Sequence, residues 1–225
     1  MPDVELPIFP LPLVLFPGTP QPLHVFEPRY RDLLRDCLAG DQRFGLSLLN
    51  PTPGAGAVPQ PGDVGCTARI TSHHPFPDGR ANLLAVGENR YVLKQLVDQD
   101  HAYLVARVEF YHDADSADAD IAGITRRVRE QFSHVVGSFA DAGGMLGVSP
   151  DLPEDPENLS FAVSAALETD LATKEGLLRL TSTAARLERL HSLLQPVVRD
   201  ATKRAAARKT AKRNGRRHTH TPSGE

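Results

Sequence analysis

Three short motifs near the N-terminus are the most informative about the fold: LPIFPL at residues 6–11, FPG at residues 16–18 and LHVFEPRY at residues 23–30. The prolines of the first motif keep the backbone extended and remove hydrogen-bond donors, which suits strands at the edge of a sheet. Pro17-Gly18 is typical of a turn. Pro28 suits the first position of a helix, and Glu27 places a carboxylate at the positive end of its dipole. These motifs are therefore expected to hold the fold.

The remaining residues up to about 112 are predicted to form short strands. Apolar, β-branched and aromatic runs alternate there with Gly, Pro and Asp, which is typical of strands separated by turns. Gly87-Glu88-Asn89 is interpreted as a hairpin turn between two of them. A helix is expected from Pro28 to Gly40, where apolar residues recur at helical spacing. The expected strands are 5–9, 13–16, 23–26, 44–49, 65–72, 81–86, 91–96 and 103–111.

The segment DADSADAD at residues 113–120 predicts an acidic linker between two domains. Beyond it the apolar period changes from 2 to 3.6 residues, which predicts helices over residues 121–200. The predicted fold class is therefore α+β, with a β-rich domain over residues 1–112 and a small helical bundle after the linker.

The C-terminal end differs from the rest of the chain in charge. From Arg199 onward, nine Lys or Arg and two acidic residues give a net charge of +7, whereas the preceding 198 residues carry −10. No apolar stripe remains beyond Ala201, so residues 201–225 are predicted to be a basic tail that is disordered or transiently helical. Such a tail could contact nucleic acid weakly by neutralising phosphates. The residues that would do so are Arg208, Lys209, Lys212, Arg213, Arg216 and Arg217.

The sequence contains none of the common catalytic or cofactor-binding motifs. It has no G-x-x-x-x-G-K-[ST], G-x-S-x-G or H-E-x-x-H, which mark a phosphate-binding loop, a nucleophile elbow and a zinc protease. Cys37 and Cys66 have no C-x-x-C partner, and His73 and His74 would face opposite sides of a strand. We therefore expect no catalysis, no cofactor and no metal site.

The composition predicts a cytoplasmic location. The two cysteines lie far apart in the sequence, which fits a reducing compartment. The apolar N-terminus lacks leading positive charges and contains five prolines in its first 18 residues, unlike a signal peptide. No apolar run is long enough to predict a membrane-spanning helix.

Several motifs together resemble the Lon protease N-terminal (substrate-binding) domain family. They are the three opening motifs, then VGCTARI (64–70), VGENRY (86–91), YLVARV (103–108), KEGLL (174–178) and RLERL (186–190). Glu175 stands where the family usually has Gln, which weakens one of these matches. The resemblance covers about residues 4–195. It implies a partly open, PUA-like β-barrel followed by a helical appendage.

The resemblance also implies a function. In full-length Lon proteases this module captures unfolded or degron-bearing substrates for an ATPase and a Ser–Lys peptidase, and the sequence shows neither, so a stand-alone member is expected. We therefore expect a non-catalytic module that binds protein or peptide segments, or a dedicated partner. The alternative is a nucleic-acid-binding protein that acts through its basic tail.

The first thirty residues contain more apolar side chains than one face of the expected strands can bury. The residues predicted to contact a protein partner are Phe16, Leu23, Val25 and Phe26. The motif residues expected to be structural are Pro17, Gly18, Glu27, Arg29 and Tyr30.

Overall fold

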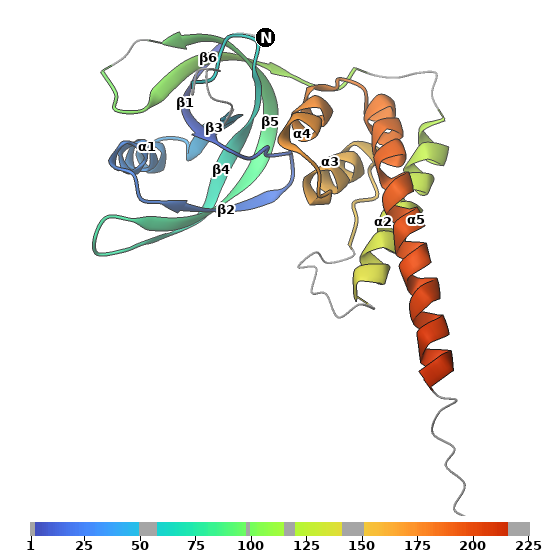
Figure 1. Cartoon of the computed structure of the whole chain (residues 1–225). Coiled ribbons are helices and arrows are strands. Elements are labelled where there is room, and N and C mark those ends of the chain that lie inside the picture. The colour runs from blue at the N-terminus through green and yellow to red at the C-terminus, as the bar shows by residue number, and fades with distance from the viewer. Residues whose placement is uncertain (1–2, 50–57, 98–99, 115–119, 141–150, 216–225) are drawn as a thin grey trace, which may run out of the picture.

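The computed structural model describes residues 3–49, 58–97, 100–114, 120–140 and 151–215. They form a β half and a helical half that lie side by side (Figure 1). The β half contains β1 (Val4–Leu11), β2 (Pro20–Val25), α1 (Pro28–Ala39), β3 (Arg43–Leu48), β4 (Val64–Pro75), β5 (Ala81–Val97) and β6 (Leu104–Tyr111). The helical half contains α2 (Ile121–Ala140), α3 (Pro156–Ala166), α4 (Leu171–Arg179) and α5 (Thr183–Gly215). The predicted α+β class is confirmed.

The six strands of the described chain form one sheet in the order β2-β5-β4-β3-β1-β6, and β5 also pairs with β6. Pairings therefore connect β1, β3, β4, β5 and β6 in a closed ring, and β2 lies outside this ring against the first half of β5. β1 and β3 run parallel, while the other paired strands run antiparallel. The PUA-like description of this sheet stays a prediction.

Two expected elements of the β half differ in the structure. The hairpin turn expected at residues 87–89 is instead the middle of the 17-residue strand β5. Gly87 is needed for a close approach of two backbones, because a Cβ atom there would lie 2.2 Å from the carbonyl oxygen of Phe16. The segment that makes this approach, residues 12–17, is a loop and not the strand expected at 13–16.

The buried side chains form several clusters, and one of them contains residues from both halves. One cluster lies within the β half and includes Leu33 and Leu34 of α1. Another consists mainly of helical residues but also includes Phe16 and Val64 of the β half. The rings of Phe16 and Phe161 lie 6.4 Å apart across this boundary. The two halves therefore share a core.

Helix α5 extends well past the boundary predicted at residue 200. It is one continuous helix to Gly215, and its C-terminal part projects away from the body of the molecule (Figure 1). Residues 201–215, expected to be disordered or transiently helical, are helical, because Ala, Lys and Arg are strong helix formers. Residues 216–225 lie outside the described part of the chain.

Candidate functional site

The four residues predicted to contact a protein partner separate into a buried and an accessible pair. Phe16 and Val25 are 0% and 1% exposed, and each belongs to one of the buried clusters. Leu23 is half-buried, and Phe26 is 57% exposed. Phe16 and Val25 therefore fill the protein's own core. Of the four residues predicted to contact a partner, only Leu23 and Phe26 remain accessible.

The neighbouring motif residues have contacts within the protein. Gly18 adopts a positive φ of 72°, and its N–H donates to the carbonyl oxygen of Gly87 over 2.8 Å. Glu27 precedes α1 and pairs with Arg29 over 2.9 Å, without capping the helix through its side chain. The Tyr30 ring lies 4.1 Å from the ring of Phe9. These contacts support the structural role expected for the motif, in which Pro17 stands in the same turn as Gly18.

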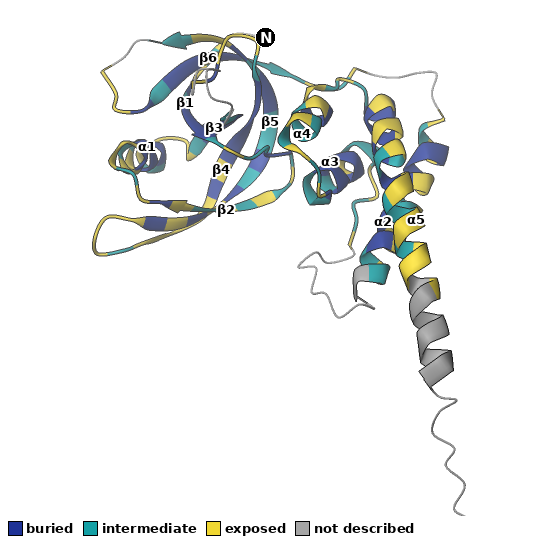
Figure 2. Cartoon of the chain, in the orientation of Figure 1, coloured by how far each residue is buried: buried dark blue, intermediate teal, exposed yellow. Residues whose placement is uncertain are grey.

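An exposed surface of aromatic and imidazole groups lies on a three-stranded ribbon. The ribbon consists of β2, residues 81–86 of β5 and residues 70–75 of β4, and Figure 2 shows its tip as largely exposed. Its outer surface, which we call the ribbon face, comprises His24, Phe26, His74, Phe76, Asn82 and Leu84.

Ring contacts and strand register bring the residues of the ribbon face together. The ring of His24 lies 5.9 Å from that of Phe26 and 6.2 Å from that of Phe76. The rings of His74 and Phe76 are 5.5 Å apart. Asn82 pairs with His24 on one side and with His74 on the other, so these three residues form one row across the strands. This row depends on pairing between strands that are distant in the sequence, so local sequence patterns could not reveal it.

The ribbon face is also apolar and hollowed beside β4. Phe26 and Leu84 are two of the three large apolar residues that are exposed in the described part of the chain. A hollow of about 360 Å³ lies at the β4–β5 pair. It is lined by Ser72, His73, His74, Asn82, Leu83 and Leu84. An accessible apolar and aromatic surface of this kind suits contact with another protein.

A buried ionic cluster joins the two halves of the molecule. Asp113 accepts hydrogen bonds from Arg90 of β5 over 2.5 Å and from Arg186 of α5 over 2.6 Å. The side chains of Arg90, Asp113 and Arg186 are 2%, 8% and 0% exposed. Arg90 also donates to the carbonyl oxygens of Leu178 and Leu180. These donors are satisfied within the protein, so the cluster is structural.

The ionic cluster corrects the interpretation of residues 113–120 as a linker in solvent. The side chain of Asp113, the first residue of that segment, is only 8% exposed, while residues 115–119 lie outside the described part. Sequence reasoning missed the cluster, although its signal was present. Arg90 belongs to the motif VGENRY and Arg186 to RLERL, two motifs that carry the family resemblance and meet here.

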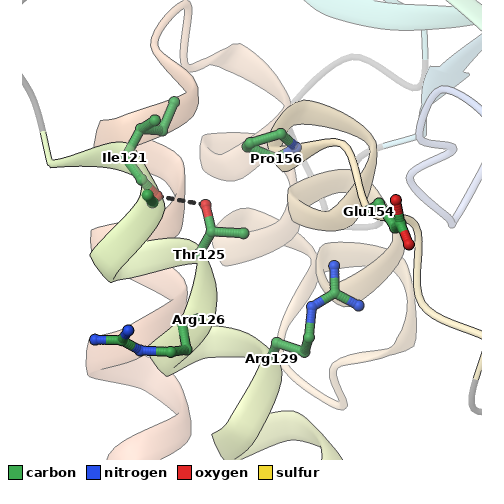
Figure 3. Close-up of a pocket in the computed structure, with 7 residues that line it drawn as sticks. Ile121, Thr125, Arg126, Arg129, Glu154 and Pro156 are labelled. Carbon is green, nitrogen blue, oxygen red and sulfur yellow. Dashed lines mark hydrogen bonds between the residues drawn. The ribbon is translucent and has the colours of Figure 1, made fainter.

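The helical half contains a wider hollow of about 590 Å³ between α2 and the start of α3 (Figure 3). Arg129 on its wall donates to the carbonyl oxygens of Leu152 and Pro153, and the Thr125 hydroxyl donates to the carbonyl oxygen of Ile121. These groups are used within the protein, and Glu154 and Arg126 bring opposite charges to the rim. The hollow is therefore a weaker candidate site than the ribbon face.

The described residues offer little for catalysis. Burial raises the pKa of the Cys37 and Cys66 thiols to about 12, which keeps them protonated and unreactive at neutral pH. In the part of the chain that the structure describes, no three His, Cys, Asp or Glu side chains gather as metal ligands would. The same part has no helix that is both long enough and apolar enough to cross a membrane.

The residues predicted to contact nucleic acid lie at the far end of the chain. Arg208, Lys209, Lys212 and Arg213 belong to the projecting part of α5. Arg216 and Arg217 lie outside the described residues. The projecting part of α5 lies away from the ribbon, on the other side of the molecule (Figure 1).

The comparison with known families agrees with the fold and the motifs. The family described as the ATP-dependent protease La (LON) substrate-binding domain matches residues 5–196. The chain belongs to this Lon substrate-binding domain family. The match includes all of β1 except Val4, the ribbon, and Arg90, Asp113 and Arg186 of the ionic cluster.

Individual relatives show how much of a Lon protease this match represents. Lon protease 1 of Hydrogenovibrio crunogenus is 25% identical over 179 residues, which cover 79% of this chain and 22% of the relative. Lon protease 1 of Myxococcus xanthus is 25% identical over 199 residues, which cover 85% of this chain and 24% of the relative. The chain thus spans about a quarter of the length of these relatives.

Two solved structures are similar over nearly their whole length. The Lon N-terminal domain protein from Xanthomonas campestris superimposes with a TM-score of 0.61 and 27% identity, covering 84% of this chain and 98% of that one. The N-terminal domain of the Mycobacterium avium complex Lon protease gives a TM-score of 0.65 at 17% identity, covering 88% and 99%. At that identity the second likeness concerns the fold alone. The similarity lies in the substrate-binding part of Lon and not in its peptidase.

Proposed function

We propose that this chain is a non-catalytic module that binds segments of other proteins, either unfolded or degron-bearing substrates or a dedicated partner. The observation that carries the proposal is the Lon substrate-binding domain match over residues 5–196. The ribbon face supports it, because an exposed Phe26 and Leu84 beside stacked rings provide contact area for apolar side chains. The buried thiols and the missing phosphate loop favour binding without turnover.

Binding of unfolded proteins tests this function directly. Purified protein is titrated with a permanently unfolded, fluorescently labelled model protein, and the same model protein in its folded state serves as the control. We expect saturable binding of the unfolded form in the micromolar range, as suits transient capture through a small surface. We also expect no ATP hydrolysis and no cleavage of casein. Absence of saturable binding up to nearly millimolar concentration would contradict substrate capture.

A nucleic-acid-binding function through the tail is the second candidate. The feature that favours it is the run of nine basic residues from Arg199 onward, part of which lies on the projecting end of α5. The net charge of −10 on the preceding 198 residues opposes a wider nucleic-acid surface. Binding of this kind should therefore reside in the tail and weaken steeply as salt is raised.

A further inference from the structure

The ribbon has a free edge along the second half of β4. The pairing between β3 and β4 ends at Arg43 and Arg69, so in the described part of the chain no strand pairs with the outer edge of residues 72–75. Residues 71–75 are all exposed. An edge strand with unpaired backbone groups is a template on which another extended chain can add.

The hydrogen bonding of the hairpin identifies which backbone groups this edge offers. The Phe76 N–H donates to the carbonyl oxygen of Arg80 over 2.7 Å. Bonded and non-bonded rows alternate in an antiparallel pair, so residues 74 and 72 direct their backbone groups toward β5. His73, between them, directs its N–H and C=O toward the outer edge. The backbone of Pro75 faces the outer edge in the same way, but proline has no N–H and so leaves no unpaired donor there.

The opposite edge of the ribbon, along β2, is protected by proline at two of its outward-facing positions. Pro20 and Pro22 pair with Val86 and Leu84 of β5. Because Leu84 directs its backbone groups toward β4, the residue opposite it on β2 directs its own groups outward. Both prolines therefore remove a donor from the outer edge of β2, which is how natural sheets protect an edge from pairing. The edge of β4 has no such protection before Pro75.

The charges at the tip of the ribbon favour an acidic partner. Arg80 pairs with Asp78 over 2.6 Å and lies 5.8 Å from the centre of the Phe76 ring. Arg31 donates to the backbone carbonyl oxygen of the same Asp78. Two guanidinium groups thus lie at the tip beside a single acidic side chain, Asp78, whose carboxylate pairs with Arg80 alone of the two.

We propose that the outer edge of β4 binds an extended, acidic protein segment with interspersed apolar side chains, which adds to the ribbon as a further strand. The inference rests on the protein-binding function proposed above and specifies its substrate class and site. Main-chain hydrogen bonds to His73 give affinity, and alternate side chains of the added strand lie beside His74 and Phe76 on the ribbon face. Its carboxylates complement Arg31 and Arg80.

Synthetic peptides test the charge and the binding mode. We use labelled eight-residue peptides that alternate Phe with Glu, the same pattern with Lys in place of Glu, and the Glu peptide with N-methylated backbone amides. The full chain should bind the Glu peptide at least about tenfold more tightly than either of the other two, since repulsion and lost backbone donors each weaken the complex. Equal affinity for the Glu and Lys peptides would overturn the acidic preference.

Matched variants of one residue test the edge itself. His73→Pro removes the outward N–H, whereas His73→Ala removes the imidazole and keeps that N–H. We expect about tenfold weaker peptide binding for His73→Pro and less than a threefold change for His73→Ala. Phe26→Ala should also weaken binding, while Val58→Ala, a change at another exposed apolar residue outside the ribbon, should not. Each variant's melting temperature confirms folding, and the N-methylated peptide tests the edge independently should His73→Pro unfold.

The outcomes separate this site from the general function. Unchanged peptide affinity in His73→Pro and Phe26→Ala, with normal capture of unfolded proteins, would overturn the site and leave protein binding in place. Loss of all binding to unfolded proteins in the wild-type chain would remove the proposed function itself. A short single-stranded RNA that displaced the Glu peptide and depended on Phe26 would instead make the ribbon a nucleic-acid surface and overturn the proposal.

Discussion

Asp113 lies between two buried guanidinium groups, Arg90 from the β half and Arg186 from the helical half. Burial alone would raise the pKa of Asp113. Hydrogen bonds from Arg186 and Thr183 and the charges of Arg186 and Arg90 outweigh this effect, so its pKa lies below the ordinary value. The guanidinium groups also lie over the Phe161 ring, at 5.0 Å for Arg90 and 4.0 Å for Arg186. One carboxylate thus neutralises much of the charge at the boundary.

Replacing Asp113→Asn should destabilise the protein strongly. The amide keeps the shape of the side chain but leaves two buried positive charges without their counter-charge, and such a loss costs about 3–5 kcal/mol. The free energy of unfolding is measured by chemical denaturation. Lys94→Gln is the control, because Lys94 pairs with Glu109 on the surface and both side chains are more than 40% exposed. That change should leave the free energy of unfolding nearly unchanged, because solvent screens an exposed ion pair, and similar losses in both variants would contradict the structural role of Asp113.

Single residues also show where sequence reasoning succeeds and where it stops. The turn at Pro17-Gly18 and the helix that begins at Pro28 follow from local backbone preferences, and the structure has both. Whether Phe16 or Phe26 is exposed depends on which face of the chain the helical half covers. That covering is a contact between segments far apart in the sequence, so the local pattern could not separate the two residues.

Among the elements, β5 shows most clearly that a local sequence pattern cannot predict contacts between distant segments. Gly87-Glu88-Asn89 has the composition of a turn, yet it lies within one long strand. A turn and a close backbone approach both favour Gly, and only the position of the loop at residues 12–17 distinguishes them. The ribbon face depends likewise on the pairing of β2, β5 and β4. The sequence therefore predicted the fold class and one exposed residue of the site, Phe26, but not the surface around it.

Truncation of α5 tests whether its basic end contributes to the fold. None of the buried-cluster members in the described part of the chain lies beyond residue 200, so deleting residues 201–225 should change the free energy of unfolding by less than about 0.5 kcal/mol. Urea denaturation of the truncated and full chains measures this. Deletion from Leu190 onward is the contrasting variant, since it removes Leu190 and Leu194 from the shared core and should destabilise the protein.

The same truncation separates the two candidate functions. Capture of unfolded proteins should be unchanged without residues 201–225, whereas any binding of nucleic acid should disappear. A truncated chain with a melting temperature many degrees lower would show that the end of α5 is packed. Nucleic-acid binding that survived both the truncation and high salt would place that activity elsewhere in the molecule.

At the scale of the whole molecule, the shared core and the ionic cluster should make the two halves unfold together. Phe16 and Val64 pack within the mainly helical cluster, and Asp113 binds both Arg90 and Arg186. Two domains unfold independently only when few buried contacts connect them, which is not the case here. The chain provides two natural probes, because its four tyrosines all lie in the β half while most of its helix lies in the other.

Acid unfolding followed by both probes tests this coupling. The pKa of Asp113 is lowered in the folded state, so its contribution to stability is fully present above the ordinary carboxyl pKa of about 3.9 and is lost as pH falls through the lowered value. The difference in unfolding free energy between the wild-type chain and Asp113→Asn should therefore stay constant from pH 7 to about pH 5 and shrink below about pH 4. Near-ultraviolet tyrosine dichroism and helical far-ultraviolet dichroism should give the same denaturation midpoint at each pH in the wild-type chain. Midpoints that separate at neutral pH would show that the halves are independent domains, and the ionic cluster would then be a local contact rather than the link between them.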